Sequence, residues 1–409
     1  MPAARTGAPM GLRKAETAER MTQSGQKNLH FSEEELGERR ARACAEAARR
    51  GLDGLLLFRQ ESLYYLTGYD TFGYVYFQCL YLGGDGAMTL LTRAPDLRQA
   101  GFTSVIEDVR VWTDAEGADP YDQLRDMLEA QGCRGKRLGV EWDAYGLTAA
   151  SGQRLAAALD GFATLEDASD LVSRLRLVKS PAEIAYVRQA AELADRSLAK
   201  AAELARPGAF EGDILAAMQA EVFRGGGDDP ANETVIGSGP GALMCRYYAG
   251  RRHLDPEDQL TLEFAGVYRH YHACLMRTIR VGPAPERQRF LYGAARDALL
   301  ASEAALRPGD PIGAVFDAHA RVLDAAGLAA HRLNACGYSL GTTFAPNWMD
   351  WPMLYAGNPV EAAPGMVFFL HMILFDSDAG LAATLGRTSL VTETGAEPLS
   401  AASLDFIVT

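Results

Sequence analysis

The sequence contains no apolar run that approaches the ~18–20 residues needed to cross a lipid bilayer. Its first 28 residues also lack the apolar core of a secretion signal, because polar, charged and small residues are mixed throughout. We therefore predict a cytoplasmic protein that does not enter a membrane, with a disordered tail over residues 1–30.

Closely spaced cysteine pairs are also absent. The six cysteines are Cys44, Cys79, Cys133, Cys245, Cys274 and Cys336. Isolated cysteines in a cytosolic chain usually act as small buried apolar residues. An excess of basic residues is missing too, since 40 Lys and Arg against 53 Asp and Glu give a net charge of −13. A general nucleic-acid binder needs a basic face to displace counterions from phosphates, so that class of protein is not expected.

The pattern of secondary structure predicts two domains. Residues 31–175 alternate short apolar strands with helices, which predicts a smaller α/β domain with a mixed sheet. Residues 176–409 start with a long helix, which Ser180 caps, Pro181 opens and Glu183 supports from the first turn. Further helices and longer strands follow. We therefore predict an α+β domain there, with helices flanking a largely antiparallel sheet.

Glu263 is the most informative polar residue. It lies in the run QLTLEFAGVY, whose Leu and Phe side chains predict a buried strand. An ionised carboxylate is costly in such a place unless it is paired or hydrogen-bonded. Two interpretations remain open. Glu263 forms a buried ion pair, for example with Arg277 on the next strand, or its pKa is perturbed because it serves at a functional site.

Histidines follow Glu263 along the chain. In RHYHACLMRT, His270, His272 and Cys274 alternate at period two, which predicts that all three side chains face the same way. Such a row is compatible with metal ligands, with the polar wall of a substrate pocket or with core packing. No further Cys/His pair lies at the spacing typical of a zinc site. His371 interrupts the apolar run MVFFLHMILF and is either a satisfied core residue or a catalyst.

Two glycine-containing segments predict loops around a pocket. IGSGPGALMCR includes Cys245 and Arg246, and it lacks the Gly-Lys-Ser/Thr ending of a phosphate-binding loop. CGYSLGTTFAPNWMDW places aromatic residues, among them Tyr338, Trp348 and Trp351, in a stretch that we predict to be irregular. These aromatic residues serve either local packing or a cage for a small cation or zwitterion.

The order of these segments resembles the pita-bread superfamily, which includes methionine aminopeptidase, prolidase, aminopeptidase P and creatinase. The resemblance covers essentially residues 31–409, in the two-domain form of prolidase and creatinase. It rests on LYYLTGY, LRLVKSPAEIAYVRQAA, IGSGPGALM, LTLEFAGVY with MRT, ALRPGDP, GYSLG and APGMVFF with LVTETG. It implies a C-terminal pita-bread catalytic domain over residues 176–409, preceded by a creatinase-type α/β domain over residues 31–175.

The chain departs from this superfamily at the metal ligands. Metallopeptidases of the fold hold two metal ions with two Asp, one His and two Glu. The corresponding positions look like Glu263, Cys274, Tyr338, His371 and either Gly386 or Arg387. A metal pair needs carboxylates that bridge and neutralise it. The departures therefore imply a protein without a metal cofactor, despite the fold.

Within the metal-free branches, the chain is similar to the ectoine hydrolases, which open the cyclic amidine of ectoine. EFAGVYRHYHACLMRT and GYSLGTTFAPNW carry the similarity. It implies that Glu263 attacks the amidine carbon. Both metal-free branches have a His where this chain has Cys245 or Arg246, so we expect His272 or His371 to carry the proton instead. If neither does, the substrate differs.

The resemblance therefore implies a hydrolase of a non-peptide C–N bond in a small zwitterionic amidine. The expected substrate-binding residues are Tyr69, Tyr74, Cys245, Arg246, Tyr338 and Trp348. Two-domain members pair as homodimers, and the segment from Tyr69 to Gln78 is expected to line the partner's pocket, with Tyr74 and Tyr76 the best candidates. The alternatives are a creatinase-like amidinohydrolase, a non-catalytic binding module of this fold and, last, an Xaa-Pro metallopeptidase.

Overall fold

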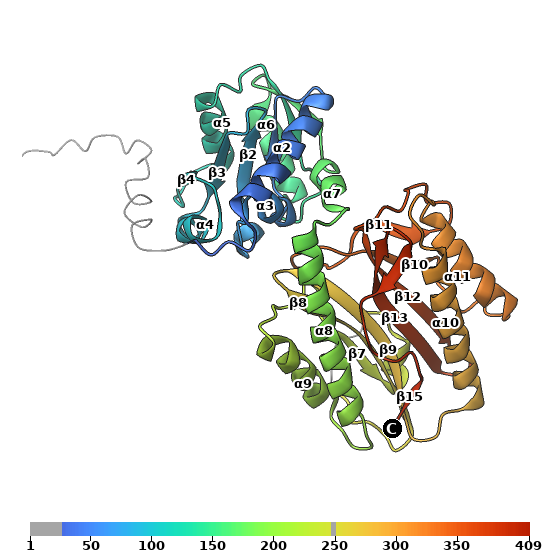
Figure 1. Ribbon diagram of the computed structural model, residues 1–409. Coiled ribbons are helices and arrows are strands. Elements are labelled where there is room, and N and C mark those ends of the chain that lie inside the picture. Colours follow the sequence, from blue (N-terminus) through green and yellow to red (C-terminus); the bar gives the residue numbers. More distant parts are fainter. Residues whose placement is uncertain (1–26, 247–250) are drawn as a thin grey trace, which may run out of the picture. The chain divides into compact units, whose positions relative to one another are not determined.

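The computed structural model describes residues 27–246 and 251–409. The chain divides into two compact units, Met1–Leu175 and Arg176–Thr409. Each unit has a sheet of its own (Figure 1). Most of the tail predicted over residues 1–30 lies outside the described residues.

The N-terminal unit is built on a six-stranded sheet with the order β4-β3-β2-β1-β5-β6. Its strands are β1 (Gly54–Leu57), β2 (Cys79–Gly83), β3 (Met88–Thr92), β4 (Asp108–Val111), β5 (Arg137–Val140) and β6 (Thr164–Asp167). β1 runs antiparallel to β2 and parallel to β5. The mixed sheet predicted for this part of the chain is therefore what the structure contains.

Helices cover both faces of this sheet. They are α2 (Glu33–Arg49), α3 (Gln60–Thr67), α4 (Leu97–Thr103), α5 (Pro120–Ala130), α6 (Ala149–Leu159) and α7 (Leu171–Arg176). Successive strand residues point to opposite faces, so Leu55 and Leu57 pack with α2 and α3, whereas Leu56 packs with α5 and α6. Ser32 starts α2 by accepting a hydrogen bond from the Glu35 backbone N–H at 3.2 Å.

The C-terminal unit contains a nine-stranded, largely antiparallel sheet. The main order is β11-β10-β12-β13-β9-β8-β7, with β14 beside β13 and β15 beside β9. The strands are β7 (Val235–Ser238), β8 (Asp258–Tyr268), β9 (Tyr271–Val281), β10 (Ala335–Ser339), β11 (Asp350–Tyr355), β12 (Val367–Asp376), β13 (Leu381–Thr392), β14 (Gly395–Pro398) and β15 (Ile407–Val408). The α+β architecture predicted for this unit is confirmed.

Strands β10 and β11 correct the prediction of an irregular stretch. Tyr338 lies in β10 and Trp351 in β11, and Trp348 alone of these three aromatic residues is in the loop between the strands. The pairing of β10 with β11 contains register shifts on both sides of Tyr338. Such shifts interrupt the alternation of buried and exposed residues that identifies a strand in a sequence.

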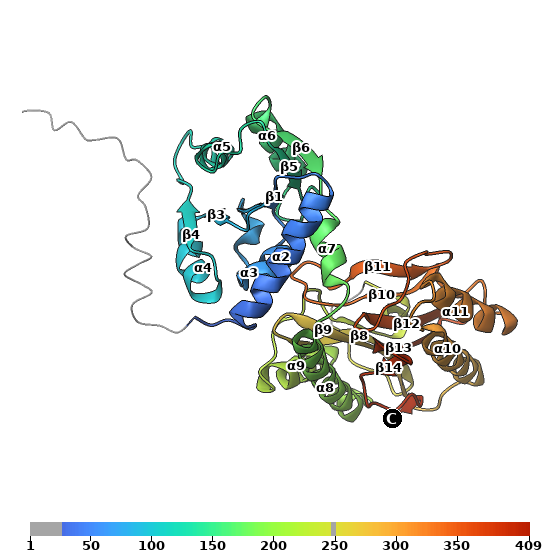
Figure 2. The same ribbon diagram turned by 45° about the horizontal axis from the view of Figure 1, so that its top comes forward.

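Four helices pack on one face of the large sheet (Figures 1 and 2). They are α8 (Pro181–Leu204), α9 (Glu211–Arg224), α10 (Glu286–Ala305) and α11 (Gly313–Ala325). Leu262 of β8 belongs to the core formed with α8 and α9, and Leu370 of β12 to the core formed with α10 and α11. Successive strand residues point to opposite faces, so Glu263, which follows Leu262, and His371, which follows Leu370, point to the other face of the sheet. We name this face the site face.

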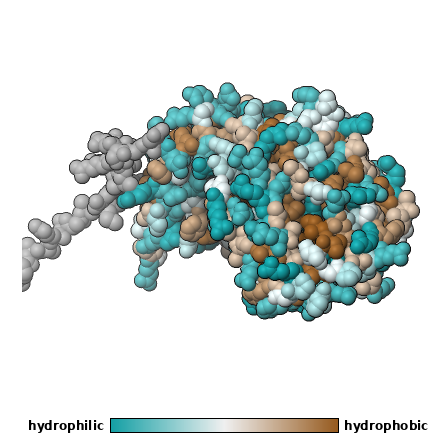
Figure 3. Space-filling view, turned by 60° about the horizontal axis from the view of Figure 1, so that its bottom comes forward, coloured by the Kyte–Doolittle hydropathy of each residue, from teal (hydrophilic) through white to brown (hydrophobic). Residues whose placement is uncertain are grey.

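The surface in Figure 3 mixes hydrophilic and hydrophobic residues, with hydrophobic residues gathered in small areas. Within the described ranges, no helix is both long enough and apolar enough to cross a membrane.

Candidate functional site

Strand register places two of the predicted residues of the C-terminal unit, Glu263 and His371, on one row of the site face. Glu263 on β8 is paired with Met276 on β9, Met276 with Gly386 on β13, and Gly386 with His371 on β12. Residues that lie directly opposite each other in a ladder point to the same face. The side chains of Glu263 and His371 therefore share a face, although 108 positions of sequence separate them.

A hydrogen-bond relay of two aromatic residues holds Glu263. The Tyr338 hydroxyl donates to Oε1 of Glu263 at 3.2 Å, and Trp348 Nε1 donates to the Tyr338 hydroxyl at 2.8 Å. No other described residue donates a hydrogen bond to this partly buried carboxylate. Burial raises the pKa of Glu263, and the hydrogen bond from Tyr338 and then the charge of Arg246 lower it. Burial is the larger effect, so the pKa is about 7. Glu263 thus changes its charge near neutral pH.

The ion pair between Glu263 and Arg277, one of the two interpretations of the sequence, does not form. Glu263 is paired with Met276, so Arg277 points to the helix-covered face. Its Nη1 donates to the carbonyl oxygens of Met276 at 2.8 Å and Gly386 at 2.7 Å. The perturbed carboxylate is therefore the interpretation that the geometry favours.

His371 is buried beside the relay. Its ring lies 5.6 Å from that of Tyr338 and 5.4 Å from that of Phe369, between centroids. Burial, and then the charge of His319, lower the pKa of His371 to about 4, so its ring is neutral at neutral pH. Its Nδ1 is buried and has no hydrogen-bond partner among the described residues. His371 is thus able to accept a proton or a hydrogen bond.

His272 is buried as well, but both of its ring nitrogens are engaged by the protein. Nε2 accepts a hydrogen bond from the Ala231 backbone N–H at 2.9 Å. Nδ1 lies 3.0 Å from the His270 carbonyl oxygen and 3.1 Å from Thr343 Oγ1. Burial, and then the charge of His270, lower the pKa of His272 to about 3. Of the two histidines predicted to carry a proton, His371 is the one that has a ring nitrogen without a hydrogen-bond partner among the described residues.

The predicted row of His270, His272 and Cys274 is only partly formed. His272 and Cys274 lie on β9 and share the site face, but His270 precedes the strand. Arg269 and His270 form the two-residue turn between β8 and β9, with φ angles of 53° and 63°. The period-two pattern did not reveal this turn, since such turns usually contain Asn or Gly, which tolerate positive φ.

Cys245 and Arg246 follow the short η4 helix (Gly239–Leu243). The charge of Arg246 lowers the pKa of both Glu263 and Cys245, which shows that the three groups lie close to one another. Burial, and then the charge of Glu263, raise the pKa of the Cys245 thiol, so this cysteine is not activated as a nucleophile. The guanidinium of Arg246 is exposed and is available to an anionic group of a ligand.

Glu211 is a supporting residue that the sequence analysis missed. Its fully buried carboxylate accepts hydrogen bonds from Ser238 N at 2.7 Å, from Arg251 N at 2.8 Å and from Arg252 N at 3.0 Å. It therefore ties together the two sides of the segment that contains Cys245 and Arg246. The local signal is an acidic residue at the start of a helix, which usually indicates no more than a favourable helix terminus.

The predicted substrate-binding tyrosines of the N-terminal unit are buried. Tyr69 has no exposed surface and belongs to the core with α2 and α3, which indicates a packing role in place of the predicted contact with substrate. Tyr74 is 8% exposed, whereas Phe72 and Tyr76 nearby are 81% and 51% exposed. In the predicted segment Tyr69–Gln78, the large side chains available to a ligand or a partner are thus those of Phe72, Val75 and Tyr76.

The residues at the five family metal positions do not fit a metal pair. Glu263 is the one carboxylate among them, and burial keeps the thiol of Cys274 protonated by raising its pKa. Neither candidate for the last position is a carboxylate: at Gly386 a side chain would start 2.9 Å from the Phe369 ring, and Arg387 donates hydrogen bonds to Glu303. Within the described ranges, no group of three or more His, Cys, Asp or Glu is placed to hold a metal ion.

The chain is similar in sequence to several hydrolases along nearly its whole length. It is 29% identical to an uncharacterized hydrolase/peptidase, y4tM, of Sinorhizobium fredii, over 93% of this chain and 99% of that protein. It is 27% identical to the ectoine hydrolase of Halomonas elongata, over 92% of this chain and 97% of that protein. The crystal structure of dipeptidase PepE from Mycobacterium ulcerans superposes with a TM-score of 0.78 at 27% identity, over 92% of this chain and 99% of that chain.

Models of two protein families match the two units. The creatinase/prolidase N-terminal domain matches residues 39–178, and metallopeptidase family M24 matches residues 185–393. Together with the two sheets and the site face, these matches confirm the pita-bread resemblance. The chain therefore belongs to the M24 family of hydrolases, in the two-domain form with a creatinase/prolidase N-terminal domain.

Proposed function

We propose that this protein is a metal-independent hydrolase that opens a C–N bond of a small zwitterionic amidine, with ectoine as the first candidate substrate. The observation that carries the proposal is Glu263, a carboxylate that ionises near neutral pH, accepts one hydrogen bond from the described residues and feels the charge of Arg246. A carboxylate and a guanidinium that interact electrostatically complement a ligand that carries an amidinium and a carboxylate.

In this proposal Glu263 is the nucleophile. Its carboxylate attacks the amidinium carbon, which is electrophilic because it bears the positive charge. The bond from this carbon to one ring nitrogen then breaks, and the leaving nitrogen takes a proton. Water attacks the adduct, which releases the ring-opened amide and restores Glu263. The hydrogen bond from Tyr338 orients one carboxylate oxygen and leaves the other available for attack.

His371 carries the proton in this scheme. It is neutral at neutral pH, shares the site face with Glu263 and has an Nδ1 to which no described residue is hydrogen-bonded. The leaving nitrogen takes its proton from solvent; His371 then accepts a proton from the attacking water and returns it to solvent, so that the protons balance. Cys245, Tyr338 and Trp348 form the wall that contacts the ring of the substrate, and Arg246 binds its carboxylate.

We further propose a homodimer in the cytoplasm, in which the N-terminal unit of one subunit completes the site of the other. The exposed Phe72 and Tyr76 support such a contact, because large apolar side chains clustered in a short segment often mark an interface. Light scattering at micromolar concentration is expected to give twice the chain mass of 44.2 kDa. A monomer mass would contradict this part of the proposal.

The direct test is to incubate the purified protein with ectoine and to follow ring opening by NMR. Activity that persists in chelator, with no metal in stoichiometric amount by elemental analysis, supports the proposal. About two metal ions per chain with activity lost to chelator would overturn it. Glu263→Gln is the negative control.

A dipeptidase is the second candidate, because the similarity to PepE extends over 92% of this chain. Creatine and Xaa-Pro dipeptides therefore belong in the same assay. Hydrolysis of creatine would indicate a creatinase-like amidinohydrolase. Hydrolysis of a dipeptide would replace the proposed function by a peptidase, and binding without turnover of any of these compounds would indicate a binding module.

A further inference from the structure

The β8–β9 turn contacts two loops that border the site face. One loop covers residues 228–234 and leads into β7, whose Val235 is paired with Glu263. The other covers residues 340–349, between β10 and β11, and contains Trp348. The turn itself is strained, because Arg269 and His270 both have positive φ angles. Such a conformation is retained where surrounding contacts impose it.

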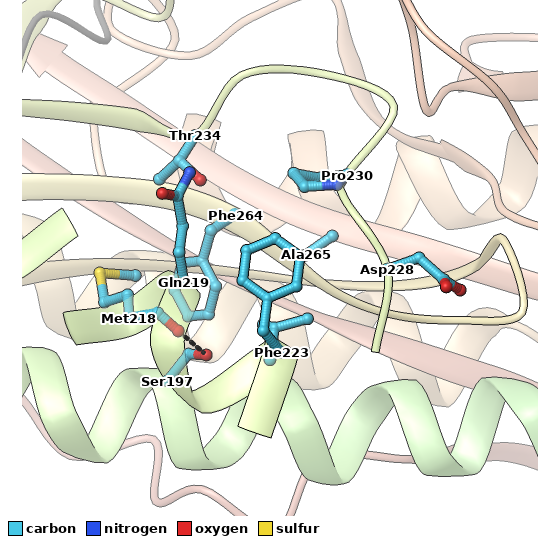
Figure 4. Close-up of a pocket in the computed structure, with 10 residues that line it drawn as sticks. Ser197, Met218, Gln219, Phe223, Asp228, Pro230, Thr234, Phe264 and Ala265 are labelled. Atoms are coloured by element: carbon cyan, nitrogen blue, oxygen red, sulfur yellow. Dashed lines mark hydrogen bonds between the residues drawn. The ribbon is translucent and has the colours of Figure 1, made fainter. Parts of the chain in front are cut away.

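The 228–234 loop is tied to the hairpin by hydrogen bonds. Ala231 N donates to His272 Nε2 at 2.9 Å, and His270 N donates to Asp228 Oδ2 at 3.0 Å. Behind the loop lies a small pocket, whose lining residues Figure 4 shows. Pro230 from the loop and Phe223 from α9 face each other across it. The two hydrogen bonds therefore join the loop to the hairpin.

The 340–349 loop is tied to the same hairpin. The backbone N–H of His272 donates to Gly341 O at 3.3 Å, and Thr343 N donates to His270 O at 3.2 Å. The His270 ring stacks on Phe344 with 4.3 Å between centroids. The ring of Trp348, whose Nε1 starts the relay to Glu263, lies 6.5 Å from that of His272.

The protonation of His272 follows from its partners. A backbone N–H can only donate, so Nε2 must be the unprotonated nitrogen. The neutral ring then carries its hydrogen on Nδ1 and donates it to His270 O or Thr343 Oγ1. Neither nitrogen is left for substrate or water.

We infer that His272 is a positioning residue, which fastens the 228–234 and 340–349 loops to the β8–β9 hairpin and thereby keeps Trp348 and Tyr338 against Glu263. The inference rests on the proposed function where it concerns catalysis, but the fastening of the loops does not depend on any substrate. It differs from the prediction that His272 carries a proton.

The test compares His272→Gln with His272→Leu. Gln retains an acceptor near the position of Nε2, whereas Leu retains volume and removes both polar contacts. The matched control is His319→Gln, the same change at another fully buried histidine, on α11. Two readouts need no substrate. They are amide hydrogen exchange of residues 228–234 and the fluorescence of Trp348, obtained by subtracting the spectrum of the same variant with Trp348→Phe.

We expect His272→Leu to accelerate amide exchange in the 228–234 loop and to shift Trp348 emission to longer wavelength. His272→Gln should stay close to the parent protein in both readouts, and His319→Gln should leave both readouts unchanged. If Leu prevents folding, His272→Asn, which is too short to reach Ala231, should give the same faster exchange. Unchanged exchange and emission in Leu or Asn would overturn the inference, whether or not ectoine proves to be the substrate.

Turnover separates positioning from proton transfer. A positioning role predicts a graded loss in kcat, roughly 10-fold for Gln and roughly 100-fold for Leu, because small displacements of a reacting group are costly. The acidic limb of the pH profile should stay where Glu263 sets it. A proton carrier would instead lose activity equally in both variants, and that result with unchanged loop exchange would restore the catalytic role.

Discussion

Two glutamates, one in each unit, differ in what surrounds them: Glu141 is buried and Glu263 is partly buried. Glu141 follows β5 in the N-terminal unit and has no exposed surface. Its carboxylate accepts hydrogen bonds from Phe58 N at 3.0 Å, Arg59 N at 2.9 Å and Ser62 Oγ at 2.5 Å. Glu263 in the C-terminal unit accepts one hydrogen bond from the described residues, from Tyr338.

Burial raises the pKa of both carboxyl groups, so burial alone does not distinguish them. The donors do. Glu141 uses both oxygens to fix the start of α3, where backbone N–H groups otherwise lack partners. Glu263 keeps an oxygen that no described residue occupies, beside the positive charge of Arg246. A buried carboxylate with all donors in place stabilises a fold, and one with a missing donor is available to a ligand.

The largest expected effect is on turnover by Glu263→Gln. Gln is nearly isosteric and cannot act as the nucleophile, so kcat should fall by more than about 10⁴-fold. The variant should keep the fold, because Gln still accepts the Tyr338 hydrogen bond. Turnover and melting temperature are measured on one preparation. A variant that melts early yet turns over ectoine at the parent rate would end the nucleophile assignment.

The next effect is a pH-dependent gain in stability in the same variant. The pKa of Glu263 is about 7 in the folded protein and 4.5 as the ordinary value, so the folded state binds the extra proton between these pH values. Its stabilisation is complete below pH 4.5 and is lost as the pH rises through 7. Glu263→Gln should match the parent near pH 4 and exceed it by about 3 kcal/mol near pH 8.

Urea unfolding of both proteins at several pH values checks this difference. His272 and His371 are present in both, so their own titration cancels. If the parent protein and Glu263→Gln are equally stable at both pH 4 and pH 8, the carboxyl group of Glu263 is not desolvated, and the structural interpretation is wrong.

Glu141→Gln should show the opposite pattern, with a smaller free-energy change. The amide would turn a donor toward groups that themselves donate, so we expect a loss of about 2 kcal/mol in the free energy of unfolding. The folded fraction should turn over substrate at the parent kcat. Loss of kcat without loss of stability would remove the distinction between the two glutamates.

The smallest expected effect comes from Tyr338→Phe. The Tyr338 hydrogen bond lowers the pKa of Glu263, so its removal should move the acidic limb of the kcat/KM profile to higher pH. Activity at pH 7 should fall roughly 10-fold and recover partly at pH 8. A uniform loss at every pH would assign Tyr338 to substrate contact instead of carboxylate orientation.

Much of the fold could be predicted because its signals are local. The cap at Ser180, the long helix α8 and the alternation along β8 and β12 all lie within short windows of sequence. β10 and β11 were missed because register shifts break their alternation. The turn at Arg269 and His270 was missed because neither residue type favours positive φ.

The candidate site was predicted less evenly. Glu263, Tyr338 and Trp348 were expected together, and the structure joins them in one relay. Tyr69 was expected to bind substrate, yet it lies in a core. Glu141 lies in an apolar segment much as Glu263 does, but only the contacts from Phe58, Arg59 and Ser62 show it to be structural.

The sequence by itself determined the class of the fold, the residues that occupy the family's ligand positions and the loss of carboxylates there, since these depend on residue identity and order. Tertiary structure alone decided which polar groups have partners. His272 and His371 were both expected from the sequence as proton carriers, since each lies in a predicted strand. The physical difference is that Ala231 and His270, brought in by loop and turn, occupy both nitrogens of His272, whereas Nδ1 of His371 has no described partner.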